Sequence, residues 1–161
     1  LDATWSPTAN LTLSFAGTFL DPVYDEFIDF NGNDLSGTSV SGVSDVITST
    51  SVLYEFGVLE TDWDGFFRAD WQYEADTDFG DGGSAAPINA ALEGLYDREV
   101  NNVNASLGFT SANGLGITFW GRNIFDHEYI TTAFPGVAQA GTWTGYPSQP
   151  QTYGVTVRKT F

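Results

Sequence analysis

The chain has 161 residues and a formal net charge of −16, because 21 acidic residues outnumber five basic ones. This charge argues against nucleic acid as a partner, since phosphate binding uses clustered Lys and Arg. Hydrophobic residues make up 42% of the chain and aromatic residues 16%, which is typical of an ordered protein rather than a disordered one. The 18 Gly residues, with frequent Thr, Ser and Asn, favour strands and turns over helices.

The chain contains neither Cys nor Met. A disulfide framework and a thiolate metal site are therefore not possible. We expect Leu1 to mark either a mature N-terminus after processing or a cut inside a longer protein. No stretch approaches the roughly 18 continuous apolar residues of a membrane helix. If the chain crosses a membrane, it does so as strands.

Several segments alternate between apolar and polar side chains with the period of two that a β-strand requires. The clearest example places Phe67, Ala69, Trp71 and Tyr73 on one face, and Arg68, Asp70, Gln72 and Glu74 on the other. The pattern predicts about six whole strands and the tail of a seventh, at residues 1–5, 11–19, 48–56, 65–74, 100–109, 115–122 and 151–161. The faces of the segment 115–122 are the least regular, because Trp120 shares the polar set with Thr118 and Arg122.

Short and long connections alternate along the chain between these segments. The turns at 6–10, 57–64 and 111–114 are compact, whereas the intervals at 21–47, 76–98 and 130–150 are long. Long structureless loops are uncommon inside a compact soluble domain. Outer-membrane barrels, however, have short turns at one end, long loops at the other, and strands of about 9–11 residues. Most acidic residues fall in the first two long intervals, so we expect the charge to lie mainly in loops.

The last strand carries the strongest membrane pattern. Tyr153, Val155, Val157 and Phe161 fall on one face, while Thr152, Gly154, Thr156, Arg158 and Thr160 fall on the other. In an outer-membrane barrel, the first set faces lipid and the second faces the lumen. Trp5, Trp63, Trp71, Tyr54, Tyr73 and Phe161 are candidates for the aromatic girdles at the two membrane interfaces.

Two sequence motifs lie near the end of the chain: Gly121-Arg-Asn-Ile-Phe-Asp-His-Glu-Tyr129 and Pro150-Gln-Thr-Tyr-Gly-Val155, followed by Phe161. Together they resemble the C-terminal end of TonB-dependent outer-membrane receptors. The matching positions are Gly121, Arg122, Asn123, Asp126, Tyr129, Pro150, Thr152, Tyr153, Gly154 and Phe161. Two positions depart from the family pattern: Gln151 stands where Arg is usual, and Lys159 lies in the lipid-facing set.

The resemblance implies an all-β fold of antiparallel up-and-down strands that forms part of a transmembrane β-barrel. Residues 1–161 would be the C-terminal segment of a receptor barrel, without its plug domain and N-terminal strands. Such receptors are not enzymes, and no cofactor is expected. They import scarce ligands, often ferric siderophores but also cobalamin or oligosaccharides, across the bacterial outer membrane. The implied partners are outer-membrane lipid, the rest of the receptor, TonB through the plug region, the barrel-assembly machinery through the terminal strand, and the ligand.

Few residues indicate other chemistry. His127 is the single His, so a hydrolase triad has no clear basis. Asp126, His127 and Glu128 could supply mixed metal ligands, but adjacent strand residues alternate sides, and we assign no metal site. The acidic stretch 76–83 lacks the spacing of an EF-hand. Phe134, Trp143 and Tyr146 lie in the last long interval, where they could contact ligand or pack against neighbouring loops.

Two other classes remain open. A passive outer-membrane porin or channel fits the alternation but explains the segment around Asn123, Asp126 and Tyr129 less well. A soluble carbohydrate-binding β-sandwich would explain the aromatic residues and acidic loops, but not the regular short and long connections. The acidic loops also bear on the ligand, because many ferric siderophores are anionic and would be repelled.

Overall fold

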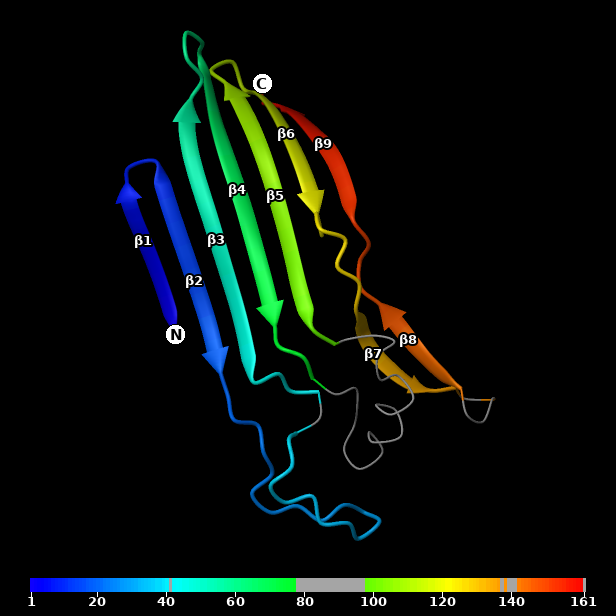
Figure 1. Ribbon diagram of the computed structural model, residues 1–161. Coiled ribbons are helices and arrows are strands. Elements are labelled where there is room, and N and C mark those ends of the chain that lie inside the picture. Colours follow the sequence, from blue (N-terminus) through cyan, green and yellow to red (C-terminus); the bar gives the residue numbers. More distant parts are fainter. Residues whose placement is uncertain (41, 78–97, 137, 139–141, 161) are drawn as a thin grey trace.

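The computed structural model describes residues 1–40, 42–77, 98–136, 138 and 142–160. These residues form nine β-strands (Figure 1). The strands are β1 (Asp2–Thr8), β2 (Leu11–Phe19), β3 (Val46–Gly57), β4 (Trp63–Glu74), β5 (Val100–Ser111), β6 (Leu115–Arg122), β7 (Ile130–Pro135), β8 (Trp143–Pro147) and β9 (Thr152–Lys159). Within the described residues, no helix is long and apolar enough to span a membrane.

Seven of these strands form one sheet in the order β1-β2-β3-β4-β5-β6-β9, and every neighbouring pair is antiparallel. β7 and β8 form a separate two-stranded sheet. The order follows the sequence except where that hairpin intervenes, which makes the large sheet a meander. The predicted all-β, antiparallel up-and-down arrangement is therefore confirmed. β1 and β9 lie at opposite edges, and the sheet is open rather than closed into a barrel.

The predicted strands match the observed ones closely, with one correction at the beginning of the chain. The residues 6–10 were predicted to form a turn, but β1 continues through Ser6 and Pro7 to Thr8. The β1–β2 register shifts between Trp5 and Thr8. Proline lacks the N–H that a central strand must donate, yet an edge strand or a bulge tolerates it. Within the described sheet, β1 is an edge strand, and Pro7 lies where its register with β2 shifts.

The interval 130–150 also differs from its prediction as a long loop. It contains the β7–β8 hairpin, in which Phe134 pairs with Thr144, and Pro135 with Trp143. Ile130 is buried there, with 8% of its surface exposed, and Ala133 and Trp143 pack against it. The hairpin therefore has a small hydrophobic cluster of its own, apart from the large sheet.

The two kinds of connection lie at opposite ends of the sheet (Figure 1). The short β1–β2, β3–β4 and β5–β6 turns share one end, and the long connections leave from the other. The β2–β3 connection is partly ordered by two isolated bridges, Val23 with Ser39 and Ile28 with Asp34. Residues 78–97 of the β4–β5 connection lie outside the described residues. Four of the acidic residues expected to charge this loop are in that range: Asp78, Asp81, Glu93 and Asp97.

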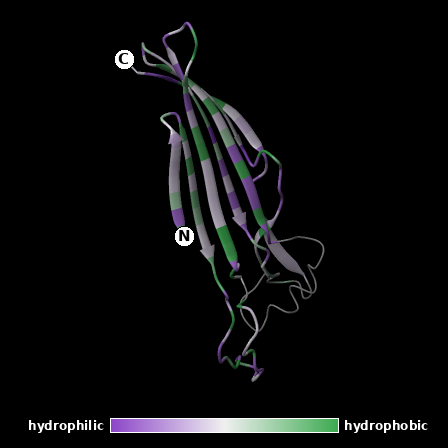
Figure 2. Ribbon diagram, turned by 60° about the vertical axis from the view of Figure 1, so that its left-hand side comes forward, coloured by the Kyte–Doolittle hydropathy of each residue, from purple (hydrophilic) through white to green (hydrophobic). Residues whose placement is uncertain are grey.

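Hydrophobic and hydrophilic residues alternate along strands of the large sheet (Figure 2), and the strand registers separate them into two faces. One row joins Leu11, Tyr54, Phe67, Leu107, Phe119 and Val155 from β2 to β9. A second row, three residues away along each strand and on the opposite side, joins Ser14, Ser51, Asp70 and Asn104. We call these the apolar face and the polar face. The uncertain faces of 115–122 are resolved by the pairing of Ile117 with Val157 and of Phe119 with Val155.

The apolar face is not covered by another layer of the described chain. Val155, Phe119 and Phe67 are 57%, 48% and 40% exposed. Among the described residues, the buried hydrophobic side chains are Val100 and Ile130. A soluble sheet buries its apolar face against a second layer, and these residues provide no such layer.

Glycines on several strands lie opposite aromatic rings. Trp120 pairs with Gly154 and Tyr153 with Gly121, while Phe66 pairs with Gly108. A Cβ at Gly154 would overlap the Trp120 ring, and one at Gly121 would lie 2.9 Å from the Tyr153 ring. Each of these rings therefore covers the backbone of the neighbouring strand, a packing in which only glycine fits.

Candidate functional site

The segment 121–129, which we call the motif segment, turns the chain out of the sheet after β6. Asn123 adopts a positive φ of 48°, and Asp126 one of 55°. Asn and Asp tolerate this left-handed conformation better than most other non-glycine residues. β6 consequently stops pairing with β5 at Ala105, and the rest of β5 faces the motif segment instead.

Asn123 organises this turn. Its side chain is 97% buried, since only 3% of the residue is exposed. Nδ2 donates to the carbonyl oxygens of His127 and Gln149, both at 3.0 Å, and Oδ1 accepts from the His127 N–H at 2.9 Å. Its backbone N–H donates to Oδ1 of Asn104 on β5 at 3.1 Å. Asn123 thus ties β5, the motif segment and the segment preceding β9 together through its side chain and its backbone N–H.

The returning segment before β9 is attached to the same turn. The Gln151 N–H donates to Oδ1 of Asp126 at 3.2 Å, and Gln151 Nε2 donates to the Ile124 carbonyl at 2.7 Å. Tyr153 Oη donates to that carbonyl at 3.4 Å. The matching positions Asn123, Asp126 and Tyr153 are therefore brought together, and Gln151 makes two of the contacts although it departs from the family pattern.

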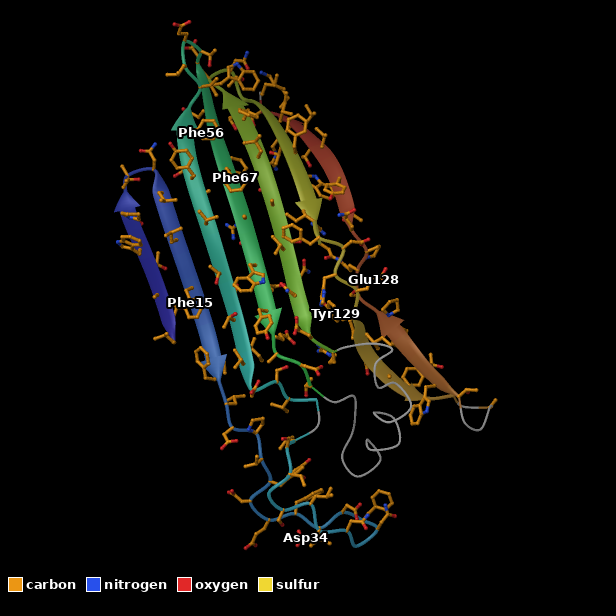
Figure 3. The ribbon with its side chains drawn as sticks, in the orientation of Figure 1. Phe15, Asp34, Phe56, Phe67, Glu128 and Tyr129 are labelled. Atoms are coloured by element: carbon orange, nitrogen blue, oxygen red, sulfur yellow. The ribbon has the colours of Figure 1, made fainter. Side chains whose placement is uncertain are left out.

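Tyr129 lies just before β7 (Figure 3); it connects the motif segment to the hairpin directly and to β4 through Arg98. Its N–H donates to Ser148 Oγ at 3.2 Å, and its carbonyl accepts from the Ser148 N–H at 2.7 Å. The Arg98 guanidinium lies over its ring, 5.8 Å from the centroid, and also bonds Glu74 at 3.4 Å. A cation over an aromatic face is attracted to the ring electrons.

The side chains with metal-binding potential are engaged in other contacts. His127 Nε2 lies 3.0 Å from the Glu99 carbonyl, and Asp126 accepts from Gln151. Within the described part of the chain, no group of three or more His, Cys, Asp or Glu side chains could hold a metal ion.

A pocket of about 580 Å³ opens on the polar face where β6 leaves the sheet. β4 contributes Asp70 and Gln72, and β5 contributes Asn102, Asn104 and Ser106. The other polar side chains that line it are Trp120, Arg122, Asn123, Gln149 and Thr156. We call this the polar pocket. Its volume lies within the range of small-molecule sites, about 300–1,000 Å³.

The two charged side chains that line the polar pocket each have a partner: Asp70 pairs with Arg68, and Arg122 lies over Trp120. The Asp70 carboxylate accepts hydrogen bonds from Nε of Arg68 at 2.9 Å and from Nη2 of Arg68 at 2.6 Å. The Arg122 guanidinium lies over the Trp120 ring, 5.4 Å from its centroid, and Trp120 Nε1 donates to Thr156 Oγ1 at 3.1 Å. The pocket therefore offers mainly uncharged donors and acceptors.

The three aromatic residues expected in the last long loop lie on the β7–β8 hairpin instead. Phe134 and Tyr146 approach each other with ring centroids 5.7 Å apart, and Trp143 packs against Ile130. Tyr146 remains 56% exposed, so its ring is open to solvent. Packing within the hairpin accounts for Trp143, while Tyr146 keeps a free surface.

Sequence patterns located most of the motif residues but not the polar pocket. Nothing in the sequence showed that β6 leaves the sheet beside Asn102 and Asn104. Pro150 and Thr152 lie at the start of β9, Gly121 and Gly154 lie under aromatic rings, and Phe161 lies outside the described residues. Comparisons of the chain with protein-family models, with curated proteins and with solved structures found no match.

Proposed function

We propose that this chain is the C-terminal barrel segment of a TonB-dependent receptor in the bacterial outer membrane, and that the whole receptor imports a scarce ligand. The observation that carries this proposal is the uncovered apolar face, which extends over all seven strands of the large sheet. Large exposed apolar surfaces on a protein mark contacts with another protein or with a membrane. A lipid-facing barrel wall accounts for this face and for the polar face behind it.

Aromatic rings at both ends of the apolar face support a strand orientation that crosses a membrane. Trp71 and Tyr73 lie near the end of the long connections, and Trp71 Nε1 donates to Asn101 at 2.8 Å. Tyr54, Phe56 and Phe109 cluster toward the short turns, with centroid distances of 5.8 and 6.2 Å. Rings at both ends of an apolar band suit the two interfaces of a membrane, where their polar atoms meet headgroups. In this arrangement, the short turns are periplasmic and the long connections extracellular.

The open edges support a larger assembly. β1 and β9 each have one strand neighbour within the described sheet. Unpaired edges cannot persist in lipid, because their N–H and C=O groups would lack partners. We therefore propose that further strands of the same receptor pair with both edges.

The motif segment favours a receptor over a porin. It resembles the receptor family at spaced positions, and five hydrogen bonds, four of Asn123 and one of Asp126, hold those positions. A passive channel would need the alternation but not this sequence. Ferric siderophores are the ligands that the resemblance implies most often, although the net charge of −16 opposes anionic complexes.

Fractionation of the source cells tests the membrane location. Peptides of this chain should be found in outer-membrane fractions, in a species that stays in solution only with detergent. Energy dependence then separates receptor from channel, because TonB-driven uptake stops when the proton gradient is collapsed and passive diffusion continues. A water-soluble species would refute both barrel classes and leave the carbohydrate-binding β-sandwich as the better account.

A further inference from the structure

The chain contains two Asn-Gly sequences, Asn31-Gly32 and Asn113-Gly114, in turns that are closed by the same kind of hydrogen bond. In each turn the glycine N–H donates to the carbonyl three residues earlier, at 3.0 Å in the first turn and 2.9 Å in the second. The glycine φ is positive in both, 85° in the first and 80° in the second. The two turns therefore form a matched pair within one chain, and their surroundings distinguish them.

An Asn-Gly sequence is chemically labile, because glycine has no side chain to hinder its backbone nitrogen. That nitrogen can attack Cγ of the preceding carboxamide. A C–N bond forms, the glycine N–H proton passes to solvent, and the side-chain amino group takes up a proton and leaves as ammonia. Water then opens the resulting succinimide ring at either carbonyl, which gives aspartate or isoaspartate. The attack requires the glycine N–H to leave its carbonyl partner, so the rate depends on how often the turn opens.

The turn at Asn113 is held by the large sheet. Oδ1 of Asn113 accepts from Ser111 Oγ at 2.7 Å and from Lys159 Nζ at 3.3 Å. The Thr160 N–H donates to the Gly114 carbonyl at 2.9 Å. Ser111 belongs to β5 and Lys159 to β9. Opening this turn therefore breaks contacts with a second strand of the sheet.

The turn at Asn31 lies in the β2–β3 connection, outside the large sheet (Figure 1). Asn31 is exposed, and an isolated bridge joins Ile28 to Asp34 on either side of it. The Asp29 carboxylate accepts from the N–H groups of Asn31 at 2.9 Å and of Asn33 at 2.8 Å. These contacts lie within residues 28–34, so this turn can open while the large sheet stays intact.

We infer that Asn31 is a site of spontaneous deamidation and that the contacts of Asn113 protect it from the same reaction. The substrate is the chain itself, and the co-reactant is water. Both products add a negative charge near the Asp29 carboxylate. Isoaspartate also adds one carbon to the main chain between the two N–H groups that Asp29 holds, so conversion releases the turn. Conversion at Asn31 goes beyond the membrane function proposed above and does not depend on it.

The test uses the purified full-length protein, incubated folded in mildly alkaline buffer, with a second sample incubated unfolded in urea. Peptide mapping at acidic pH, which prevents further conversion, measures aspartate and isoaspartate at both positions over time. The unfolded sample gives the rates that the two Asn-Gly sequences have by themselves. Asn31→Gln is the control variant, because a glutamine must close a larger ring and converts far more slowly.

We expect the folded protein to convert Asn31 at least tenfold faster than Asn113, and the unfolded chain to convert the two at rates within threefold of each other. A ratio in the folded protein no greater than that in the unfolded chain would overturn the inference. Hydrogen exchange at the Asn33 amide should be faster in the converted protein than in the Asn31→Gln variant incubated in the same way. Equal exchange would contradict the release of the turn.

Discussion

The side chain of Asn123 and the backbone of His127 bond each other in both directions. Nδ2 donates to the His127 carbonyl at 3.0 Å, and Oδ1 accepts from the His127 N–H at 2.9 Å. The pairing closes a four-residue turn in the same way that a short stretch of backbone would. It also fixes where the chain returns, because the same Nδ2 holds the Gln149 carbonyl.

Replacing Asn123 with Ala should strongly destabilise the protein. The change removes the three hydrogen bonds that this side chain makes to the backbone of His127 and Gln149, at about 0.5–1.5 kcal/mol each. Asn10→Ala is the matched control, because Asn10 makes a single exposed side-chain bond, to Glu55. Urea titration of the detergent-solubilised protein measures both variants. Equal midpoints for the two would contradict the role given to Asn123.

Gly154→Ala should disturb the packing of Trp120. A Cβ at this position overlaps the indole ring, which must then leave Thr156 and Arg122. Overpacking of this kind costs about 1–3 kcal/mol. Gly57→Ala is the control, since no atom lies within 4 Å of a Cβ there. Thermal melting should separate the two variants, and an unchanged melting temperature for Gly154→Ala would show that the ring does not depend on the glycine.

The β2–β3 connection should loosen only in acid. The Asn33 side chain and backbone N–H, followed by Asn31, lower the pKa of Asp29 below its ordinary value of 3.8. A lowered pKa means that the carboxylate stabilises the folded loop fully above pH 3.8, and that this contribution is lost as pH falls through the folded pKa. Hydrogen exchange at the Asn31 and Asn33 amides, corrected for intrinsic rates, should stay slow from pH 7 to 5. Fast exchange at neutral pH would contradict the loop described here.

A charge on the apolar face should impair the protein more than one on the polar face. Leu107→Lys would place an ammonium group in lipid, at about 2–4 kcal/mol near the midplane, whereas Ser49→Lys would face the lumen. The fraction of folded protein recovered from outer membranes measures the difference. If the apolar face met water, Leu107→Lys would be nearly neutral, because exposed surface substitutions change stability by only about 0.5 kcal/mol.

The sequence was sufficient to predict the long strands, because their period of two is continuous. In β4, for example, Phe67, Trp71 and Tyr73 alternate with Arg68, Asp70 and Gln72, and the observed register follows that alternation. Pro7 led to the wrong end for β1, because proline is a turn signal in most contexts. Proline is tolerated in an edge strand, but the sequence alone does not show which strand lies at an edge. The strand order could also be predicted, as short turns connect antiparallel neighbours.

The hairpin and the polar pocket could not be predicted for a different reason. The β7–β8 pairing joins segments separated by residues with no regular alternation, so Thr132 and Tyr146 gave no local sign of their contact. The pocket depends on the positive φ of Asn123, which is a property of the folded turn. Asn123 could be identified as a motif position, but two of its three partner residues, Asn104 and Gln149, come from distant parts of the chain.

The central claim is that the apolar face contacts lipid and the polar face contacts water. The chain contains no Cys, so single cysteines can be introduced along β5 at positions 102–109 and spin-labelled in the protein reconstituted into lipid bilayers. Labels at 103, 105, 107 and 109 should be accessible to oxygen, which concentrates in lipid, and those at 102, 104, 106 and 108 to a water-soluble nickel reagent. Alternation with a period of two and this phase would support the account. Equal access of the nickel reagent to both sets would contradict it.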